Sequence, residues 1–365
     1  MFSVRIAFVE HKSPDMARIA DLLEESARAN FWANRGPVYR KMQALFSEHL
    51  GPGSDRKIVP VANGGVALEA MARLNAARAG RKLRWVASAF SFQNLGRGYF
   101  SDVSFVDCDA DGRISLTALS QLDPKSYDGI IATNPFGLFT DFSDLAALAN
   151  SHGKVFLIDN ASGLHSSIPD VPWQAFSLHH TKPYGMGEGG LALVPTREAE
   201  ALYEIVNYGP KISDDVRPHW LENGKLSDIS AAFLIDRLEQ FPEWGPPALE
   251  QRQRVISIAG QYGLTPLKTP ESDIPLTSMP FVASVPIPLA ATESTAHAIY
   301  AKYYRPLAPL PCVTDIYERL VNIPCHQDME RLSDEKIAED MERCVAAISE
   351  SDWRQSRHSS HHSTG

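Results

Sequence analysis

Short apolar runs alternate with segments of helical periodicity through the first two thirds of this 365-residue chain. Uninterrupted apolar runs are typical of strands buried on both faces, and a helical segment between two such runs is the usual crossover of a parallel sheet. The pattern therefore predicts an α/β fold with a mostly parallel sheet covered by helices on both faces. The expected strands are residues 83–87, 103–106, 129–132 and 155–158, with 173–178 and 191–195 extending the sheet.

The sequence changes in character after about residue 243. The run Trp244-Gly245-Pro246-Pro247 contains residues that interrupt helices, and we expect it to separate two domains. Beyond it we expect a long polar helix, proline-broken strands over 279–288, a helix near 292–304 and a final amphipathic helix. The predicted organisation is a large domain that binds the cofactor identified below (1–245), a smaller α+β domain (246–350) and a disordered tail (351–365).

Charge and cysteine usage exclude several classes of protein. The chain has 35 Lys and Arg against 44 Asp and Glu, a net charge of −9, which is the wrong sign for binding nucleic acid through its phosphates. No uncharged apolar run approaches the roughly 18 residues that span a bilayer, and the first residues lack the pattern of a secretory leader. The four cysteines form no C-x-x-C pair. We expect a cytoplasmic protein with no membrane or nucleic-acid partner and no bound metal.

The string Gly185-Met186-Gly187-Glu188-Gly189-Gly190 satisfies the G-x-G-x-x-G pattern of dinucleotide-binding proteins. That fingerprint requires a helix after the glycines, so that the helix N-terminus meets the pyrophosphate. Here an apolar run ended by Pro195 follows instead. We therefore interpret the string as a glycine-rich turn that enters a strand.

Four further features each have an ordinary structural explanation when taken alone. Asp159, which ends an expected strand, could cap a helix, and Lys182 could be a surface charge. Asn63-Gly64-Gly65 could be a simple turn before a helix, and Phe92 could belong to the core. Their order along the chain suggests a joint role. Amides at a helix start can hold a phosphate, an aromatic ring can stack on a cofactor, a carboxylate can keep a pyridine nitrogen protonated, and a lysine can form a Schiff base. These are the parts needed to bind pyridoxal phosphate (PLP).

Several longer strings carry a resemblance to a known family. Ser177 to Lys182, followed by Gly187-Glu188-Gly189-Gly190, resembles S-F-H-x-T-K…G-E-G-G and is the most specific of them. Residues 63–68 resemble S/N-G-T-A-A-L, and residues 223–232 resemble N-Y-R-M-S-E-L-Q-A-A. Weaker matches lie at residues 31–37, 91–92, 134–137, 157–161 and 320–326. Taken together, the chain resembles the DegT/DnrJ/StrS family of sugar aminotransferases, PLP enzymes of the aspartate aminotransferase fold (fold type I).

The resemblance implies roles for individual residues. Lys182 is the catalytic Schiff-base lysine, and Asp159 is the catalytic partner of the pyridinium nitrogen. Phe92 stacks on the ring, and Asn223 reaches the phosphate of a neighbouring subunit in a homodimer with shared active sites. The implied cofactor-binding set is Gly64, Gly65, Phe92, Asp159, Ser162, Ser177, Lys182 and Asn223. Ser162 is a departure, since the family usually has Gln or His beside the cofactor phenolate.

The resemblance also implies an activity. The expected function is transfer of an amino group from an amino acid, glutamate, to a nucleotide-linked keto sugar. Two alternatives stay open: a PLP-dependent sugar dehydratase or deoxygenase, and a non-catalytic regulator that binds PLP or a sugar nucleotide. Dehydratases of this family usually replace the lysine by histidine, and this chain keeps Lys182. Arg35 and Lys225 are candidates for contacting the sugar diphosphate, although both could be solvated surface charges.

Overall fold

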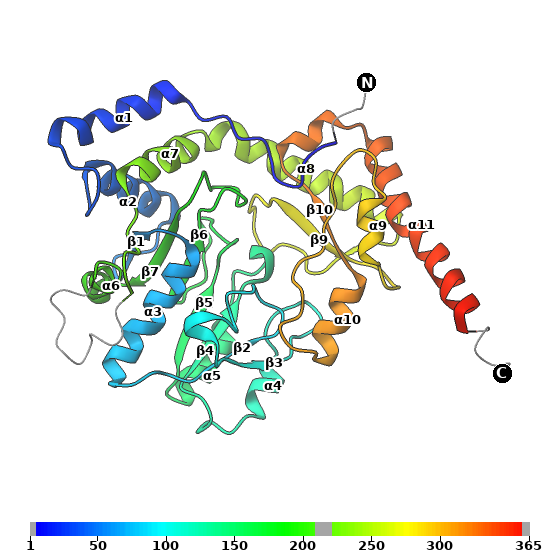
Figure 1. Cartoon of the computed structure of the whole chain (residues 1–365), viewed down its shortest axis with the longest axis horizontal. Helices are drawn as coiled ribbons and strands as arrows, with labels where there is room; N and C mark the ends of the chain where they lie inside the picture. Colours follow the sequence, from blue (N-terminus) through cyan, green and yellow to red (C-terminus); the bar gives the residue numbers. More distant parts are fainter. Residues whose placement is uncertain (1–4, 209–220, 360–365) are drawn as a thin grey trace.

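A seven-stranded sheet in the order β1-β7-β6-β5-β4-β2-β3 forms the centre of the larger part of the molecule (Figure 1). Neighbouring strands are parallel except at β7, which runs antiparallel to β6 and β1, so the predicted mostly parallel sheet is confirmed. The computed structural model describes residues 5–208 and 221–359, with side chains as far as residue 346. The strands are β1 (Arg56–Val61), β2 (Trp85–Ser88), β3 (Ser104–Val106), β4 (Gly129–Thr133), β5 (Val155–Asp159), β6 (Gln174–Ser177) and β7 (Gly190–Pro195). Strand β1 was not among those expected.

Side chains on the two faces of this sheet enter different cores, as the alternation of a strand requires. On one face, Leu157 and Val59 pack with the alanine-rich helix α3. On the other face, Ile158 packs towards the C-terminal part of the chain, and Ile58 packs with α1, α2 and α7. The helices of this part are α1 (Met16–Ala29), α2 (Pro37–Leu50), α3 (Gly64–Ala79), α4 (Leu116–Ser120), α5 (Ser143–Ser151), α6 (Ala199–Ile205) and α7 (Asp228–Glu239).

Strand register brings the functional end of the sheet together. Thr133, the last residue of β4, pairs with Asp159, the last residue of β5. Asp159 in turn pairs with Ala175 of β6. Ligands of open α/β sheets bind beyond the carboxyl ends of parallel strands, so this register places Asp159 where a ligand would lie.

A second, antiparallel sheet of three strands, in the order β10-β9-β8, forms the smaller part. The α+β character predicted for this part of the chain is therefore present. Its strands are β8 (Thr265–Pro266), β9 (Ser278–Val282) and β10 (Leu320–Pro324), and its helices are α9 (Leu289–Glu293), α10 (Pro311–Arg319) and α11 (Asp334–Ser359).

The long helix expected after Pro247 is present, but two local predictions in this region are wrong: the start of that helix and a second helix further on. Helix α8 (Phe241–Gln261) runs through Pro246 and Pro247 without ending. Proline inside a helix costs about 3 kcal/mol, but buried Trp244 anchors the helix against Tyr184 and Arg237. The helix expected over 292–304 is also absent, because α9 ends at Glu293. Beyond it, Ala298 forms a bridge with Ile6 and Ala301 forms a bridge with Asn322.

The first described residues lie beside the smaller sheet (Figure 1). Ile6 exchanges backbone hydrogen bonds with His297 and Ile299, and His326 contacts the carbonyl oxygen of Ala7. The large domain predicted for residues 1–245 thus includes a segment that packs on the smaller one, and the exact limits remain predictions. Helix α11 extends into the segment expected to be a disordered tail, and residues 360–365 lie outside the described part of the chain.

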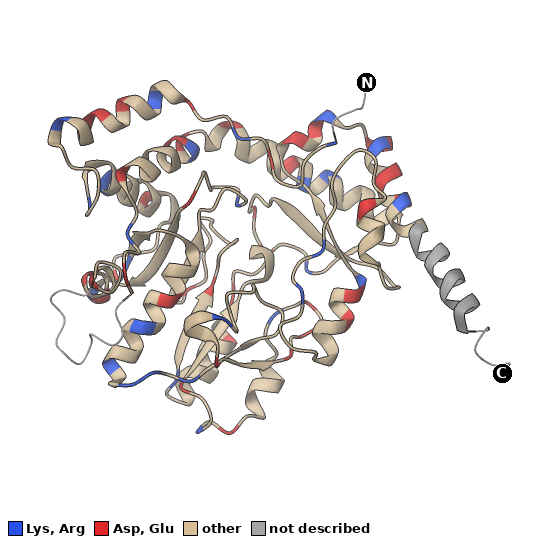
Figure 2. Cartoon of the chain, viewed as in Figure 1, with Lys and Arg blue, Asp and Glu red and all other residues tan. Residues whose placement is uncertain are grey.

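Charged side chains lie mainly on the peripheral helices, and the central strands are largely uncharged (Figure 2). This distribution matches the burial of the apolar strands between helices. None of the described helices is long and apolar enough to cross a membrane.

Candidate active site

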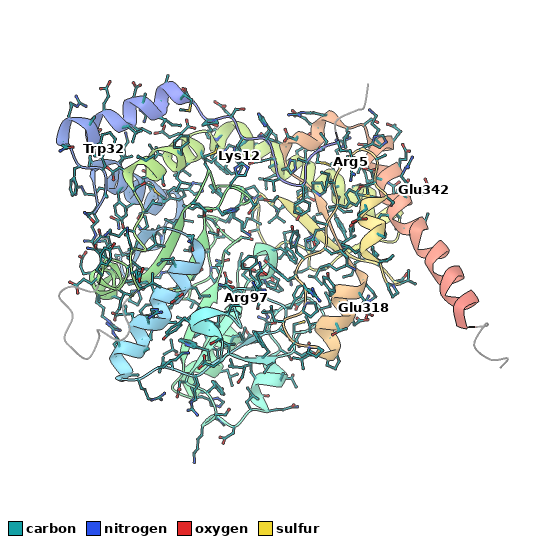
Figure 3. All side chains as sticks on the ribbon, in the orientation of Figure 1. Arg5, Lys12, Trp32, Arg97, Glu318 and Glu342 are labelled. Atoms are coloured by element: carbon teal, nitrogen blue, oxygen red, sulfur yellow. The ribbon has the colours of Figure 1, made fainter. Side chains whose placement is uncertain are left out.

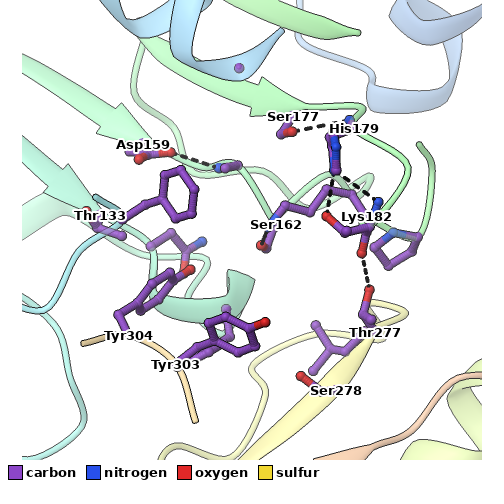
Figure 4. A pocket seen from close by; sticks show the side chains of 18 of the residues that line it. Thr133, Asp159, Ser162, Ser177, His179, Lys182, Thr277, Ser278, Tyr303 and Tyr304 are labelled. Atoms are coloured by element: carbon purple, nitrogen blue, oxygen red, sulfur yellow. Dashed lines mark hydrogen bonds between the residues drawn. The ribbon is translucent and has the colours of Figure 1, made fainter. Parts of the chain in front are cut away.

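A cavity of about 580 Å³ lies beyond the carboxyl ends of β4, β5 and β6, between the two sheets (Figure 4). Its lining comes from both parts of the chain, including Thr277 and Tyr304 of the smaller part. Of the predicted cofactor-binding residues, the cavity brings together Gly64, Gly65, Phe92, Asp159, Ser162, Ser177 and Lys182. Residues distant in sequence therefore converge on one space, as the resemblance implied.

The N-terminus of α3 faces this cavity with two backbone donors available. The Asn63 side chain accepts from the Val66 N–H (2.9 Å) and its carbonyl accepts from the Ala67 N–H (3.1 Å). The amides of Gly64 and Gly65 therefore remain for a ligand, at the positive end of the helix dipole. A Cβ at Gly64 would lie 3.0 Å from the Cβ of Ser177, so glycine permits this close approach. The arrangement suits a phosphate beside the Ser177 hydroxyl.

Asp159 is a buried carboxylate with little hydrogen bonding of its own. It is 6% exposed and accepts one bond, from the Ala161 N–H at 3.2 Å. Burial raises the pKa of its carboxyl, while the Ala161 N–H and the Lys182 charge lower it. A turn, not a helix, follows Asp159, so capping does not explain it. The carboxylate has acceptor capacity left for a protonated nitrogen.

A network of buried amides fixes the chain next to Asp159. Asn134 donates to the Asn160 Oδ1 atom (2.8 Å), and Asn160 donates to the Gln174 Oε1 atom (2.9 Å). Gln174 then donates to the carbonyl oxygens of Pro169 and Val171. Because buried amides in such a network have few alternative partners, it holds the strand ends in a single arrangement.

Lys182 lies across the cavity from Asp159, and its Nζ donates to the Ser162 Oγ at 2.9 Å (Figure 4). Burial lowers the pKa of Lys182, although Asp159 raises it. A lowered pKa increases the share of neutral amine, which is the nucleophilic form. The glycine-rich turn is as expected, since the His180 N–H bonds to the Gly187 carbonyl and β7 begins at Gly190.

Lys12, labelled in Figure 3, secures the loop that carries Lys182. Its Nζ donates to the carbonyl oxygens of His180 (2.8 Å), Lys182 (2.5 Å) and Gly185 (2.6 Å). Its charge is balanced by buried Glu10, which also pairs with Arg237. Sequence analysis missed Lys12, because nothing local in the sequence shows that the N-terminal segment crosses this loop.

Tyr304 is a further cavity residue that sequence analysis missed. Burial raises the pKa of its phenol, as does the Asp159 charge, while interactions with the Phe136 backbone and the Ser162 side chain lower it. Tyr304 thus lines the same cavity as Ser162, whose Oγ accepts from Lys182 Nζ. Tyr304 was missed because a helix was expected over 292–304. That helix would have placed Tyr304 at its end, with no reason to expect it in the cavity.

The remaining candidates do not line the cavity formed by the described residues. Asn223 forms an isolated bridge with Asn207, whose side chain accepts from Lys225 Nζ (2.6 Å). Arg35 pairs with Glu200 (2.7 Å) and lies over the ring of Tyr203. Within one chain, these residues are engaged elsewhere on the surface.

Comparison with known proteins decides the family. Residues 15–262 match the family model described as the DegT/DnrJ/EryC1/StrS aminotransferase family. The chain belongs to this family. It is 26% identical to the protein Rv3402c of Mycobacterium tuberculosis over 96% of this chain and 91% of that one. It is 24% identical to L-glutamine:2-deoxy-scyllo-inosose aminotransferase of Streptoalloteichus tenebrarius, over 81% and 76% of the two chains.

The fold of the chain is also similar to that of solved sugar aminotransferases. The crystal structure of DesI in the presence of its TDP-sugar product superposes with a TM-score of 0.77 at 17% identity, covering 95% of this chain and 93% of that one. The aspartate aminotransferase fold (fold type I) is thereby confirmed, and this member of the sugar aminotransferase family is a PLP-dependent enzyme.

The residues of the cavity fit the cofactor of this family. Gly64 and Gly65 offer amides for a phosphate, Asp159 offers a carboxylate with spare acceptor capacity, and Lys182 offers an amine of lowered pKa. Phe92, half exposed on the cavity wall, offers a ring face.

Proposed function

We propose that this enzyme transfers an amino group from glutamate to a keto sugar linked to a nucleotide. The observation that carries the proposal is the pairing of a buried amine, Lys182, with a buried carboxylate, Asp159, across one cavity. The crystal structure of DesI with its TDP-sugar product supports the class of acceptor. The name of the inosose aminotransferase indicates that a cyclic ketone can also be the acceptor in a relative.

When bound, PLP supplies a ring that withdraws electrons from the carbon losing a proton. The Asp159 carboxylate would hold a proton on the ring nitrogen, and the amides of Gly64 and Gly65 would fix the phosphate with Ser177. The Lys182 amine would take the proton from the α-carbon of the donor and return it to the cofactor carbon on the other side of the transferred nitrogen, a general acid–base role. Ser162 would orient that amine, and Phe92 would exclude water from one ring face.

The retained lysine favours amination over the alternative reactions. Removal of a sugar hydroxyl in the related dehydratases accompanies replacement of this lysine by histidine, and here Lys182 occupies the cavity. A regulator that binds only a sugar nucleotide would not require this amine, and a regulator that binds PLP would differ from the enzyme by the absence of turnover. We therefore propose that neither alternative is the principal activity.

We also propose that the active unit is a homodimer. Among the described residues lining the cavity, the basic side chains are Lys182 and His179, too few to neutralise both a diphosphate and a donor carboxylate. Asn223 and Lys225 lie together on the surface, where they could complete the cavity of a second subunit. Cytoplasmic location remains part of the proposal, supported by four free cysteines.

An acceptor and donor panel tests the reaction. The PLP-loaded enzyme is incubated with glutamate or glutamine and with nucleotide-linked 3-keto sugars, nucleotide-linked 4-keto sugars or free cyclic ketones. We expect 2-oxoglutarate release that depends on both glutamate and a nucleotide-linked acceptor. Turnover with free cyclic ketones alone would contradict the acceptor class, and turnover with glutamine alone would contradict the donor.

Two further measurements test the site. Borohydride reduction of the PLP-loaded protein followed by peptide mapping should place the phosphopyridoxyl group on Lys182; a different lysine would reject the assignment, and Lys154→Ala provides a control without effect. Mixing inactive Lys182→Ala with Asn223→Ala should restore activity through hybrid sites if the dimer shares them. Full activity of a demonstrated monomer would contradict the shared site.

A further inference from the structure

Two cysteines from different parts of the chain lie side by side away from the active site. Cys108 follows β3 in the larger part, and Cys312 is the second residue of α10 in the smaller part. Their sulfur atoms and a carboxylate oxygen of Asp107 all lie within 4.8 Å of one another. Cys108 is buried and Cys312 is partly exposed, so Cys312 is the residue of the pair nearer to solvent.

Asp107 holds the backbones of the two cysteines close together. Its carboxylate accepts from the backbone N–H groups of Cys108 (2.9 Å), Cys312 (2.8 Å) and Val313 (2.9 Å). The last two belong to the first turn of α10, so a side chain from one part of the chain caps a helix of the other. The backbones of both cysteines are therefore held next to each other by their hydrogen bonds to one carboxylate.

The surroundings distinguish the two thiols. Burial raises the pKa of both, and the Asp107 charge raises them further. The interaction between the two side chains raises the pKa of Cys108 and lowers that of Cys312. Cys312 also lies at the N-terminus of a helix, which favours a thiolate. Cys312 is thus the thiol that ionises first and the one nearer to solvent.

The same geometry opposes a metal ion at this cluster. Both oxygens of Asp107 already accept backbone N–H groups, and a cation would lie at the positive end of α10. A disulfide needs neither the carboxylate nor a positive charge. The arrangement therefore favours sulfur–sulfur chemistry over metal binding.

We propose that Cys108 and Cys312 form a reversible disulfide that joins the two parts of the chain when the protein meets a low-molecular-weight disulfide such as oxidised glutathione. The Cys312 thiolate attacks one glutathione sulfur, and the other glutathione leaves as a thiolate. The Cys108 thiol then loses its proton and attacks the Cys312 sulfur, releasing the second glutathione. Two electrons pass from the two cysteines to glutathione disulfide, which is reduced to two thiols.

The disulfide would act on a segment that reaches the cavity. Leu307, five residues before Cys312, donates its N–H to the carbonyl oxygen of Ala89 (2.9 Å), and Tyr304 in the same segment lines the cavity. A covalent bond at Cys312 would fix this segment to the larger sheet. Oxidation should therefore restrict any movement of the smaller part relative to the cavity.

The test uses the full-length PLP-loaded protein equilibrated with reduced and oxidised glutathione without oxygen, followed by alkylation and non-reducing peptide mapping. We expect a peptide pair linked through Cys108 and Cys312, a mass lower by two hydrogens, and a rise in melting temperature on the order of 5 °C. The linkage should form faster as the pH rises, because only the thiolate attacks.

Variants give the controls. Cys312→Ser should lose both the linkage and the melting shift, whereas Cys344→Ala should keep both, since that thiol lies elsewhere. Both thiols alkylated after oxidation, or glutathione left on Cys312 with no linkage, would overturn the proposal. Stoichiometric binding of Zn²⁺ in equilibrium dialysis that is lost in Cys312→Ser would overturn it in favour of a metal site.

Discussion

Replacing Asp159 by asparagine should lower activity and raise the stability of the cofactor-free protein at the same time. The carboxylate is 6% exposed and receives one N–H bond of 3.2 Å, so the folded chain holds a poorly solvated charge. Asparagine has nearly the same shape without that charge. The two effects have opposite signs because the charge serves the bound cofactor and not the fold.

The activity loss follows from the value of one buried charge-assisted hydrogen bond. Such a bond contributes about 1.5–3 kcal/mol, and about 1.4 kcal/mol changes a rate tenfold. Asp159→Asn should therefore reduce kcat roughly 10- to 150-fold, with a smaller effect on cofactor retention. Single-turnover kinetics with glutamate on the PLP-loaded variant measures the step directly.

The stability gain depends on pH in a direction set by the pKa shift. Burial raises the pKa of Asp159 in the folded state, so below the ordinary carboxyl pKa both states hold the proton and no cost exists. As the pH rises, the unfolded state ionises first and the wild type loses stability. The variant should gain on the order of 1 kcal/mol over wild type at neutral pH and almost nothing near pH 3.

Denaturant unfolding of the cofactor-free proteins at several pH values checks this, with Asp102→Asn as the control at an exposed carboxylate. The Asp102 side chain is 57% exposed, so its substitution should change neither activity nor the pH dependence. Near-normal turnover in Asp159→Asn, or a neutral-pH stability below that of wild type, would refute the reasoning.

Three other substitutions probe the supports of the site. Gly190→Ala should weaken PLP binding at least tenfold in a fluorescence titration. The new Cβ would lie 2.6 Å from the Gly64 nitrogen and displace the amides that are expected to hold the phosphate. Gly260→Ala is the matched control, because a Cβ there has nothing within 4 Å. Lys12→Met should lower the free energy of unfolding by about 2–4 kcal/mol, since the carbonyls of His180, Lys182 and Gly185 lose the Lys12 ammonium and the Lys182 carbonyl keeps only the Gly185 N–H; equal stability would show that water replaces the ammonium. Tyr304→Phe should shift the visible absorption band of the PLP-loaded protein and its pH midpoint, whereas an unchanged spectrum would confine Tyr304 to packing.

The strands and the strand-end carboxylate could be predicted from the sequence because their signals are local. An apolar run such as residues 129–132 can be satisfied only by burial, and helical spacers between such runs leave few arrangements besides a parallel sheet. The order of Gly64, Gly65, Phe92, Asp159 and Lys182 already indicated PLP, and the family resemblance assigned the role of each and added Ser162 and Ser177. The resemblance supplies by analogy the spatial proximity that spacing alone does not contain. The long polar helix was expected only after Pro247 and begins at Phe241 instead, since a buried contact overrides the local preference of proline.

By itself the sequence determined the α/β architecture, the end of the sheet that binds a ligand and the residue types offered to the cofactor, because each follows from patterns within one segment. Only the tertiary structure decided that Lys12 binds the loop that carries Lys182, that Tyr304 lines the cavity with Ser162 and Lys182, and that Cys108 lies beside Cys312. The residues brought together in this way lie far apart along the chain: Lys12 and Lys182 are 170 positions apart, and the bond from His11 to Asp328, which helps to place the N-terminal segment, spans 317. Their positions follow from how the two sheets pack, and no pattern within either segment records that packing.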